Sequence, residues 1–387
     1  MLRIMHMISD LDLGGAEAAA AEMALGLDRA RFSPSVCCLR KSGALAERLR
    51  SGGVSVYEVR FAARTSMVGI IRLASLLRRA GIHIVHTHLR RAGTAGRLAA
   101  FLARTPCAVH HEHSLEREPN LRQRWLYRWL TRRTQAVLCV SRRVLAERLA
   151  WTSANPRPFR VFYNFVDRRR FQPRAEANRE IKAELGLSPD SILIGTVGRL
   201  SPIKNQALFL RSAAAVSERM PQARFIIVGD GRLRPDLEKL AADLGVADRA
   251  IFTGSREDVE RFYAAFDLFA LTSSSEGFGL AAVEAQACGA PVVCTAAGAT
   301  SEVVAHEISG LIAAEHTPQA VAAAMLRILQ DKTLAERLRS GGLESAKRFD
   351  REDAMRRLEE IYLSLCPQPR REAPAEPGHL PFRPGDS

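Results

Sequence analysis

The chain has 387 residues, 47% of them apolar and 25% charged, which suits two domains with their own cores and excludes a wholly disordered protein. Its net charge of +14 is uneven: residues 1–172 carry 30 Lys+Arg and 12 Asp+Glu (+18), and residues 173–387 carry 26 and 30 (−4). The basic half predicts an anionic partner, such as nucleic acid, anionic lipid or a phosphorylated acceptor, although an Arg-rich proteome would give the same count.

Cysteine usage and hydropathy predict a cytoplasmic protein. The seven Cys residues form no CxxC pair and no His/Cys zinc spacing, and most stand in apolar runs. Met1–Ser9 has the pattern of a strand and not of a signal peptide. No apolar run reaches the ~18–20 residues of a membrane-spanning helix, so we expect a soluble protein or one that is peripheral on the inner face of the membrane.

Residues 1–172 alternate short apolar runs with helical patterns, which predicts a parallel sheet covered on both faces. The first pair is a strand at Leu2–Ile8 and a helix at Ala16–Gly26. Further helices are predicted at Ile70–Ala80 and Ala92–Ala103, and further strands at Ser35–Leu39, Val54–Val59, Ile82–His86, Ala108–His111, Ala136–Val140 and Phe159–Phe162.

Charges and prolines interrupt this pattern at Asp167–Pro189, around a short helix at Glu176–Leu185, and a second series follows. Its predicted elements are strands at Ile192–Val197, Arg224–Val228, Ala250–Thr253, Leu268–Leu271, Pro291–Cys294 and Gly310–Ile312, and final helices at Pro318–Gln330, Leu334–Arg348 and Arg351–Leu365. The fold class is therefore α/β, with two doubly wound Rossmann-like domains, 1–172 and 173–366, facing each other across a cleft. The last helix is a candidate to pack back on the first domain, and the Pro-rich tail 367–387 is expected to be disordered.

Ligands of such sheets bind beyond the carboxyl ends of the strands, so motifs that follow strands carry the functional signal. Gly14-Gly15-Ala16-Glu17 opens the first helix, where glycines and free N–H groups suit a phosphate, although a tight strand-to-helix turn has the same pattern. In the second half, Gly198 to Asn205 places Arg199 and Lys204 on one loop, a pair that could neutralise a diphosphate. The next loop contains Gly229 in a Gly-Asp-Gly sequence, which is a weak signal alone.

The strongest motif runs from Glu276 to Glu284 and brackets a glycine turn that opens a helix. Glu276 is expected in the turn, beside the cleft, and Glu284 about two turns into the helix. The free N–H groups of the turn suit phosphate, and a carboxylate at Glu284 suits paired ribose hydroxyls. The alternative is an ordinary helix with two surface glutamates.

In this order, the motifs resemble the family-four retaining glycosyltransferases of the GT-B fold. The resemblance covers about residues 3–362 and rests on Gly-Arg-Leu-x-x-x-Lys-Asn from Gly198, Gly-Asp-Gly from Gly229 and Glu-Gly-Phe-Gly-Leu-x-x-x-Glu from Glu276. Further similar stretches are Gly14–Glu17, Tyr163–Asp167, Gly289–Val293 and Glu302. Phe165 stands where the family often has Gly, and Gly298-Ala299 replaces a frequent Gly-Gly, which could alter the fit around the donor sugar.

The resemblance implies a role for each matching position. Arg199 and Lys204 would bind the donor diphosphate and stabilise the leaving group, and Glu284 would hold the ribose hydroxyls. Glu276 would contact the transferred sugar, and Gly15 would approach the phosphate from the other domain. The remaining donor-binding positions are Gly229, Gly277, Phe278, Gly279 and Leu280.

His113 matches the active-site histidine of the family, although His110 and His111 leave its register open. The implied mechanism breaks the bond to the anomeric carbon, with Arg199, Lys204 and helix N–H groups stabilising the departing diphosphate. No metal and no cofactor is then expected. The resemblance also implies retention at the anomeric carbon.

Two weaker patterns could indicate metal. Asp10-Leu11-Asp12 is an Asp-x-Asp tripeptide of the kind that binds divalent metal in another glycosyltransferase fold, but its place before Gly14-Gly15 argues against that role. His83, His86 and His88 cluster at a strand end, where a zinc site would need further ligands in space. Lining of the cleft, in contact with acceptor or sugar, is the preferred interpretation of these histidines, with simple packing at the strand end close behind it.

A third pattern could indicate membrane contact. Leu121, Trp125 and Trp129 share one helical face within the Arg-rich segment 121–133, as in helices that rest on anionic membranes. An ordinary core-facing helix with a basic solvent side fits equally.

The sequence thus predicts a hexosyltransferase-type enzyme that moves a sugar from a nucleoside-diphosphate sugar to a glycan or lipid-linked glycan, in polysaccharide or lipopolysaccharide synthesis. One alternative is a nucleoside-diphosphate-sugar epimerase of the same fold. A nucleic-acid-binding protein would need a recognition motif, and we find none, so no nucleic-acid partner is expected. A nicotinamide enzyme is disfavoured because no Gly-x-Gly-x-x-Gly opens the first helix.

Overall fold

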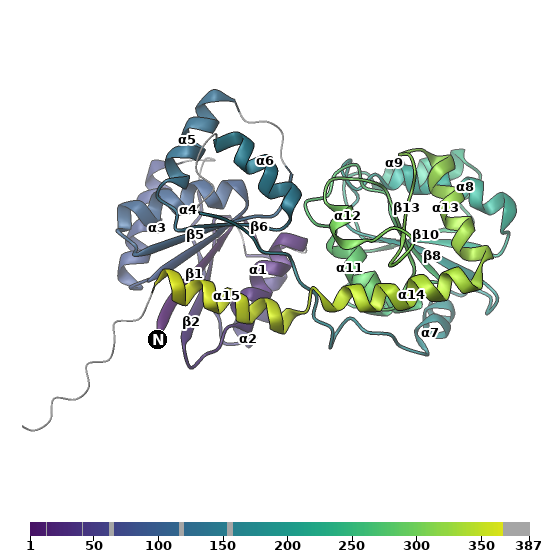
Figure 1. Cartoon of the computed structure of the whole chain (residues 1–387), viewed down its shortest axis with the longest axis horizontal. Helices are drawn as coiled ribbons and strands as arrows, with labels where there is room; N and C mark the ends of the chain where they lie inside the picture. The colour runs from purple at the N-terminus through teal and green to yellow at the C-terminus, as the bar shows by residue number, and fades with distance from the viewer. Residues whose placement is uncertain (13, 41, 62–65, 116–119, 153–157, 367–387) are drawn as a thin grey trace, which may run out of the picture.

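The computed structural model describes residues 1–12, 14–40, 42–61, 66–115, 120–152 and 158–366. It has two lobes, each built on a parallel sheet with helices on both faces (Figure 1). The predicted fold class, two Rossmann-like domains, is confirmed. The disorder predicted for 367–387 lies outside the described residues. No described helix combines the length and the apolar character needed to cross a bilayer.

The N-terminal sheet has the order β3-β2-β1-β4-β5-β6-β7, with every neighbouring pair parallel. Its elements are β1 (Leu2–Ile8), α1 (Gly15–Gly26), β2 (Phe32–Cys38), α2 (Leu45–Ser51), β3 (Ser55–Glu58), α3 (Met67–Arg79), β4 (Ile84–His88), α4 (Leu89–Ala103), β5 (Cys107–Glu112), α5 (Leu121–Thr131), β6 (Ala136–Cys139), α6 (Arg142–Thr152) and β7 (Phe159–Val161).

The second sheet has the order β10-β9-β8-β11-β12-β13, again parallel. Its elements are α7 (Ala177–Glu184), β8 (Ile192–Val197), α8 (Gln206–Arg219), β9 (Ala223–Val228), α9 (Arg234–Asp243), β10 (Ala250–Gly254), α10 (Val259–Ala265), β11 (Leu268–Leu271), α11 (Leu280–Ala287), β12 (Val292–Cys294), α12 (Thr300–Val303), β13 (Leu311–Ile312), α13 (Pro318–Gln330) and α14 (Lys332–Lys347), before α15 (Arg351–Leu365).

Several predicted boundaries differ from the structure by two or three residues. Helices α3 and α4 begin at Met67 and Leu89, and not at Ile70 and Ala92. Two further differences, in β4 and β2, have a physical reason. We expected β4 to end at His86, but it runs to His88, because His86 and His88 are fully buried in the sheet and not at a solvated strand end. We expected β2 to begin after Pro34, but it begins at Phe32. Pro34 pairs with Ile4 of β1, whereas the pairing of β2 with β3 begins only at Ser35. The missing N–H of the proline therefore costs no hydrogen bond to β3.

The chain crosses between the lobes twice, and the two crossings are hydrogen-bonded to each other. The N–H of Val166 donates to the carbonyl of Phe349 (2.8 Å), and that of Arg351 donates to the carbonyl of Val166 (3.1 Å). Beyond this link α15 leaves the C-terminal lobe and lies along the N-terminal one (Figure 1). Its Leu358 and Tyr362 are buried in one core with β1, β4 and β5, so the last helix completes the N-terminal lobe.

Candidate functional site

The candidate site begins at the carboxyl ends of β8 and β11, which are neighbours in the C-terminal sheet. This is the point where the strand order changes direction, the usual ligand position in a doubly wound sheet. After β8 the loop carries Arg199 and Lys204 and ends at Asn205, which caps α8 by accepting a hydrogen bond from Leu208 N. Gly229 lies on the loop after β9, where a Cβ would collide with the carbonyl of Gly198. The packing of these two loops therefore requires a glycine here, whether or not a ligand binds.

Lys204 and Glu276 form an ion pair in which Lys204 Nζ lies 2.7 Å from Glu276 Oε1. Ser273 Oγ donates to the same oxygen at 2.6 Å. The Glu276 side chain is 10% exposed and that of Lys204 29%, so the pair is largely shielded from solvent but not fully buried. An ammonium that suits a phosphate thus lies next to a carboxylate that suits sugar hydroxyls, and the roles assigned to the two residues stay predictions.

The glycine turn that follows brings the two lobes together. A Cβ on Gly277 would collide with the backbone of His113 and Ser114 in the N-terminal lobe, which only glycine avoids. Gly279 has φ +98° and precedes the first residue of α11, Leu280. The Phe278 side chain is buried against Phe349, so any ligand contact at this residue comes from its backbone.

Glu284 lies on α11 and is partly buried. Tyr263 donates a hydrogen bond to Glu284 Oε2 at 2.9 Å. Burial raises the pKa of the Glu284 carboxyl to about 7, although the hydrogen bond from Tyr263 and the charges of Arg170 and Lys204 act in the opposite direction. The group is therefore poised to ionise near neutral pH when hydroxyl donors reach it.

The Gly14-Gly15 turn approaches this site from the N-terminal lobe. A Cβ on Gly14 would lie 3.0 Å from Arg199 Nη2, and a Cβ on Gly15 would lie 4.0 Å from Leu280 Cδ2. Burial raises the pKa of the nearby Glu17 carboxyl, which lies close to Arg199. The structure thus brings the glycine motif of the N-terminal lobe next to the basic loop of the C-terminal lobe.

His113 follows β5 and is buried, and its Nε2 lies 3.0 Å from His88 Nδ1. Its backbone carbonyl is the atom that faces Gly277. His110 instead bonds Glu112 Oε1 through Nε2 (3.0 Å). The His113 assignment stays a prediction, but among the three histidines its backbone is the one that adjoins the glycine turn.

A buried charge cluster holds this end of β5. Arg148 Nη2 lies 3.0 Å from Glu112 Oε2 and donates to the carbonyl of Ser114 at 2.9 Å. Tyr127 donates to Glu112 Oε1 at 2.9 Å. Burial alone would raise the pKa of Glu112, but His110 and Arg148 outweigh it and hold that pKa far below its usual range. The cluster fixes the backbone that carries His113, and the sequence analysis did not predict it.

Glu302 is a second feature whose role sequence reasoning missed, although the residue was part of the resemblance. Its carboxylate accepts hydrogen bonds from the backbone N–H groups of Arg142 and Arg143, both at 2.9 Å, at the start of α6. It also accepts from Tyr163 Oη at 3.1 Å. A carboxylate at a helix N-terminus is favoured by the helix dipole, and these hydrogen bonds link the two lobes.

Two weaker sequence patterns are separated or reassigned by the structure. Asp10 pairs with Arg40 (3.6 Å), and neither Asp10 nor Asp12 belongs to a metal-competent group among the described residues. Grouping His83 with His86 and His88 was wrong, because His83 precedes β4 and its Nδ1 accepts a hydrogen bond from Arg3 N (3.0 Å). The strand's ~3.3 Å rise per residue places His83 far from the carboxyl end, where other histidines gather instead.

Comparisons with known proteins show the family of the chain. Residues 177–344 match the family described as "Glycosyl transferases group 1", and residues 13–170 match "Glycosyltransferase Family 4". One relative is the Escherichia coli UDP-Gal:alpha-D-GlcNAc-diphosphoundecaprenol alpha-1,3-galactosyltransferase, 31% identical over 69% of this chain and 72% of the relative. The chain belongs to the group 1 glycosyltransferases. Another relative is a D-inositol 3-phosphate glycosyltransferase of Thermobispora bispora, 29% identical over 79% of this chain and 76% of that protein.

Solved structures show that this glycosyltransferase has the GT-B fold. Anabaena Alr3699/HepE in complex with UDP and glucose matches with a TM-score of 0.85 and 23% identity, over 94% of this chain and 100% of the other. WaaG, a glycosyltransferase involved in lipopolysaccharide biosynthesis, matches with a TM-score of 0.75 and 16% identity, over 92% and 99%. The fold and enzyme class expected from the sequence are confirmed.

Proposed function

We propose that this glycosyltransferase moves a hexose from a nucleoside-diphosphate sugar, with a UDP-sugar as the first candidate, to a glycan or lipid-linked glycan acceptor, with retention at the anomeric carbon. The observation that carries the proposal is the Lys204–Glu276 pair beside Arg199, at the carboxyl ends of β8 and β11 and opposite Gly14-Gly15. The Escherichia coli relative, whose name specifies UDP-Gal and a diphosphoundecaprenol-linked acceptor, supports both substrate classes. A role in cell-surface polysaccharide or lipopolysaccharide synthesis is part of the proposal.

In this mechanism the donor diphosphate lies between the Gly14-Gly15 turn and the basic loop. Arg199 and Lys204 stabilise the negative charge that develops on the diphosphate as the anomeric bond breaks. Glu276, released in part from Lys204, accepts hydrogen bonds from the transferred sugar, and Glu284 accepts them from the ribose. His113 lies beside the sugar. Side-chain cations and backbone N–H groups supply the charge stabilisation, so the transfer step is proposed to need no metal.

The first test is binding and slow hydrolysis across a panel of nucleoside-diphosphate sugars with the wild type, Lys204→Ala and Glu284→Ala. Lys239→Ala, which changes an exposed lysine of α9 in the same lobe, is the matched control. We expect selective binding of one donor, at least tenfold weaker in the two site variants and unchanged in the control. Binding that is indifferent to both site changes would refute the assignment, and donor turnover to an epimerised sugar without acceptor would favour the epimerase alternative.

Gly15→Ala gives a sharper test of the phosphate contact. The added methyl group meets only Leu280 at 4.0 Å, an ordinary van der Waals contact, so the fold itself tolerates it. If the donor phosphate approaches this backbone, the methyl group occupies its space, and we expect kcat/KM to fall about 100-fold with an unchanged melting temperature. Unchanged kcat/KM would place the phosphate elsewhere. Retention is tested separately, by the anomeric proton coupling of the first-formed product.

Peripheral membrane contact is the remaining part of the proposal. On α5, Leu121 is 82% exposed and Trp125 66% exposed, within the basic N-terminal lobe, whereas Leu130 of the same helix is buried. Apolar side chains on a basic surface suit an anionic bilayer. We expect the wild type to co-float with vesicles that contain 30% anionic lipid and Leu121→Ser/Trp125→Ser to lose this. Met67→Ser, at an equally exposed site on α3, is the control, and equal flotation of all three would contradict the proposal.

A further inference from the structure

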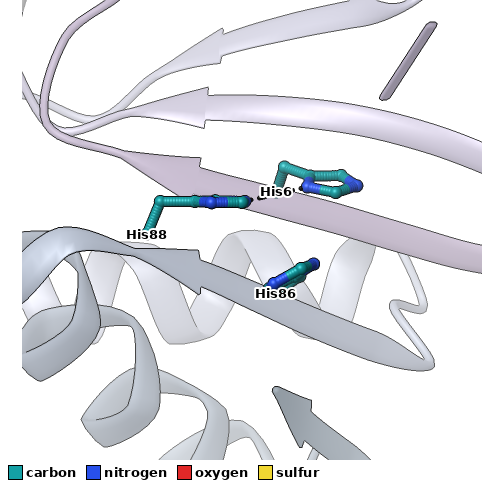
Figure 2. A group of neighbouring side chains, drawn as sticks. All are labelled: His6, His86 and His88. Carbon is teal, nitrogen blue, oxygen red and sulfur yellow. Dashed lines mark hydrogen bonds between the residues drawn. The ribbon is translucent and has the colours of Figure 1, made fainter. Parts of the chain in front are cut away.

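Five histidines gather at the carboxyl ends of β1, β4 and β5, on the sheet face that α15 covers. They are His6, His86, His88, His111 and His113. The first four have no exposed surface and the last is 9% exposed. Figure 2 shows His6 on β1 opposite His88 and His86 on β4. The apolar rows of the sheet thus end in a cluster of imidazoles at the level of the cleft, where aliphatic side chains would ordinarily complete the core.

The cluster contains more nitrogen atoms than it has hydrogen-bond partners. His6 Nδ1 lies 3.0 Å from His88 Nε2, and His86 Nδ1 lies 2.6 Å from Tyr362 Oη. No protein partner is found for Nε2 of His6, Nε2 of His86 or either ring nitrogen of His111 within the described residues. Each buried polar atom without a partner costs about 1–3 kcal/mol, so the arrangement is costly as simple packing.

Burial disfavours the charged form of these imidazoles. Burial lowers the pKa of His6 to about 3, and burial together with the neighbouring histidines lowers the pKa values of His86 and His88 well below the usual value. A neutral imidazole keeps a lone pair on one ring nitrogen, which is the form that coordinates a metal.

We propose that His6, His86 and His88 form a binding site for a divalent transition metal, with Zn²⁺ as the first candidate. One ring nitrogen from each residue lies within 4.8 Å of the other two. At Zn–N distances of about 2.0–2.1 Å, tetrahedral ligands are separated by about 3.3 Å, so small side-chain movements close the site. Three imidazoles without a carboxylate favour Zn²⁺, Cu²⁺ or Ni²⁺ over Mg²⁺ or Ca²⁺.

The outer contacts favour this triad over the overlapping one of His88, His111 and His113. Ligating histidines normally bond a second group through the other ring nitrogen. His86 has Tyr362 for this purpose, and His88 has His113, whose Nε2 lies 3.0 Å from His88 Nδ1. His6 has no such partner for its Nε2, but in the other triad both His111 and Nδ1 of His113 lack one among the described residues.

A metal in this position would also affect the transfer site. With His88 Nε2 bound to the metal, its Nδ1 must carry the proton and donate to His113 Nε2. The proton of neutral His113 then lies on Nδ1, so the metal selects one tautomer of the histidine beside the glycine turn. This consequence rests on the proposed role of His113, whereas metal binding does not.

The test is a titration of the metal-stripped, tag-free, full-length protein with Co²⁺ and Zn²⁺. We expect one equivalent of Co²⁺ to give the intense visible absorption of a tetrahedral site, displaced by Zn²⁺ and not by excess Mg²⁺. His6→Asn and His86→Asn should weaken binding at least 100-fold. Tyr362→Phe, which keeps the core volume, should weaken it about 10–100-fold through the lost outer contact. His306→Ala and His316→Ala, at exposed positions of the C-terminal lobe, are controls and should bind as the wild type does.

Absence of a stoichiometric site in the wild type would overturn the proposal, and so would binding that survives in His6→Asn or His86→Asn. Binding lost in His111→Asn but retained in His6→Asn would move the site to the other triad and overturn the assignment made here. If the Asn variants lack the wild-type circular dichroism spectrum, the wild-type titration and Tyr362→Phe decide the question. Because the readout is metal binding, its failure is distinguishable from failure of the glycosyl-transfer proposal.

Discussion

Replacing Glu284 with Gln should make the ligand-free protein more stable at pH 8, although it removes a residue proposed to bind the donor. The carboxyl pKa rises from 4.5 to about 7 on folding, chiefly through burial. A group whose pKa is raised in the folded state contributes its full stability below the unfolded pKa and loses it as pH rises through the folded pKa. That shift corresponds to about 3 kcal/mol lost between pH 4.5 and pH 8. Gln keeps the shape and the acceptor for Tyr263 but cannot ionise.

The assay is urea unfolding of wild type and Glu284→Gln at pH 5, 6, 7 and 8 without donor. The free energy of unfolding of the variant minus that of the wild type should rise by about 2–3 kcal/mol from pH 5 to pH 8. Donor affinity should fall about tenfold or more in the same variant, because charge-assisted hydrogen bonds to hydroxyls are lost. A stability difference that stays constant over this pH range would refute the reasoning from burial. Glu336→Gln, at an exposed position of α14, is the control and should show no such pH dependence.

Three further outcomes follow from particular contacts. Gly277→Ala should lower kcat about 100-fold with little change in donor Kd, because the methyl group collides with the His113 backbone only when the lobes meet. Equal losses in kcat and in donor affinity would contradict this. Glu302→Gln should widen the interlobe distance distribution measured between two spin labels and weaken the closed state by about 1–2 kcal/mol, through loss of charge at the α6 N-terminus; an unchanged distribution would rule the link out. Arg148→Met should destabilise the N-terminal lobe by about 3–5 kcal/mol because it leaves Glu112 buried without its cation, and Glu112→Gln/Arg148→Met should recover part of the loss; additive melting-temperature changes would contradict this coupling.

The sequence alone determined the layered architecture and most of the elements. Strands β8 and β11 and helices α13 and α15 have the predicted limits, because continuous apolar runs and helical periodicity are local properties of the chain. Motifs that follow strands could be assigned to the cleft for a topological reason, since carboxyl ends of parallel strands meet at one edge. The glycosyltransferase class came from the order of those motifs.

Only the tertiary structure decided which distant side chains meet. The Lys204–Glu276 pair joins two loops, the Glu302 contacts join two lobes, and Arg148 on α6 reaches Glu112 on β5, so no spacing in the sequence encodes them. The histidine cluster shows the same limit. Polar residues in β4 were taken for a strand end, whereas their burial depends on β1, β5 and a helix that begins more than 250 residues later. The local sequence pattern determines the secondary structure that one segment prefers. Contacts between segments depend on the strand order and on the path of α15, which exist only in the folded chain.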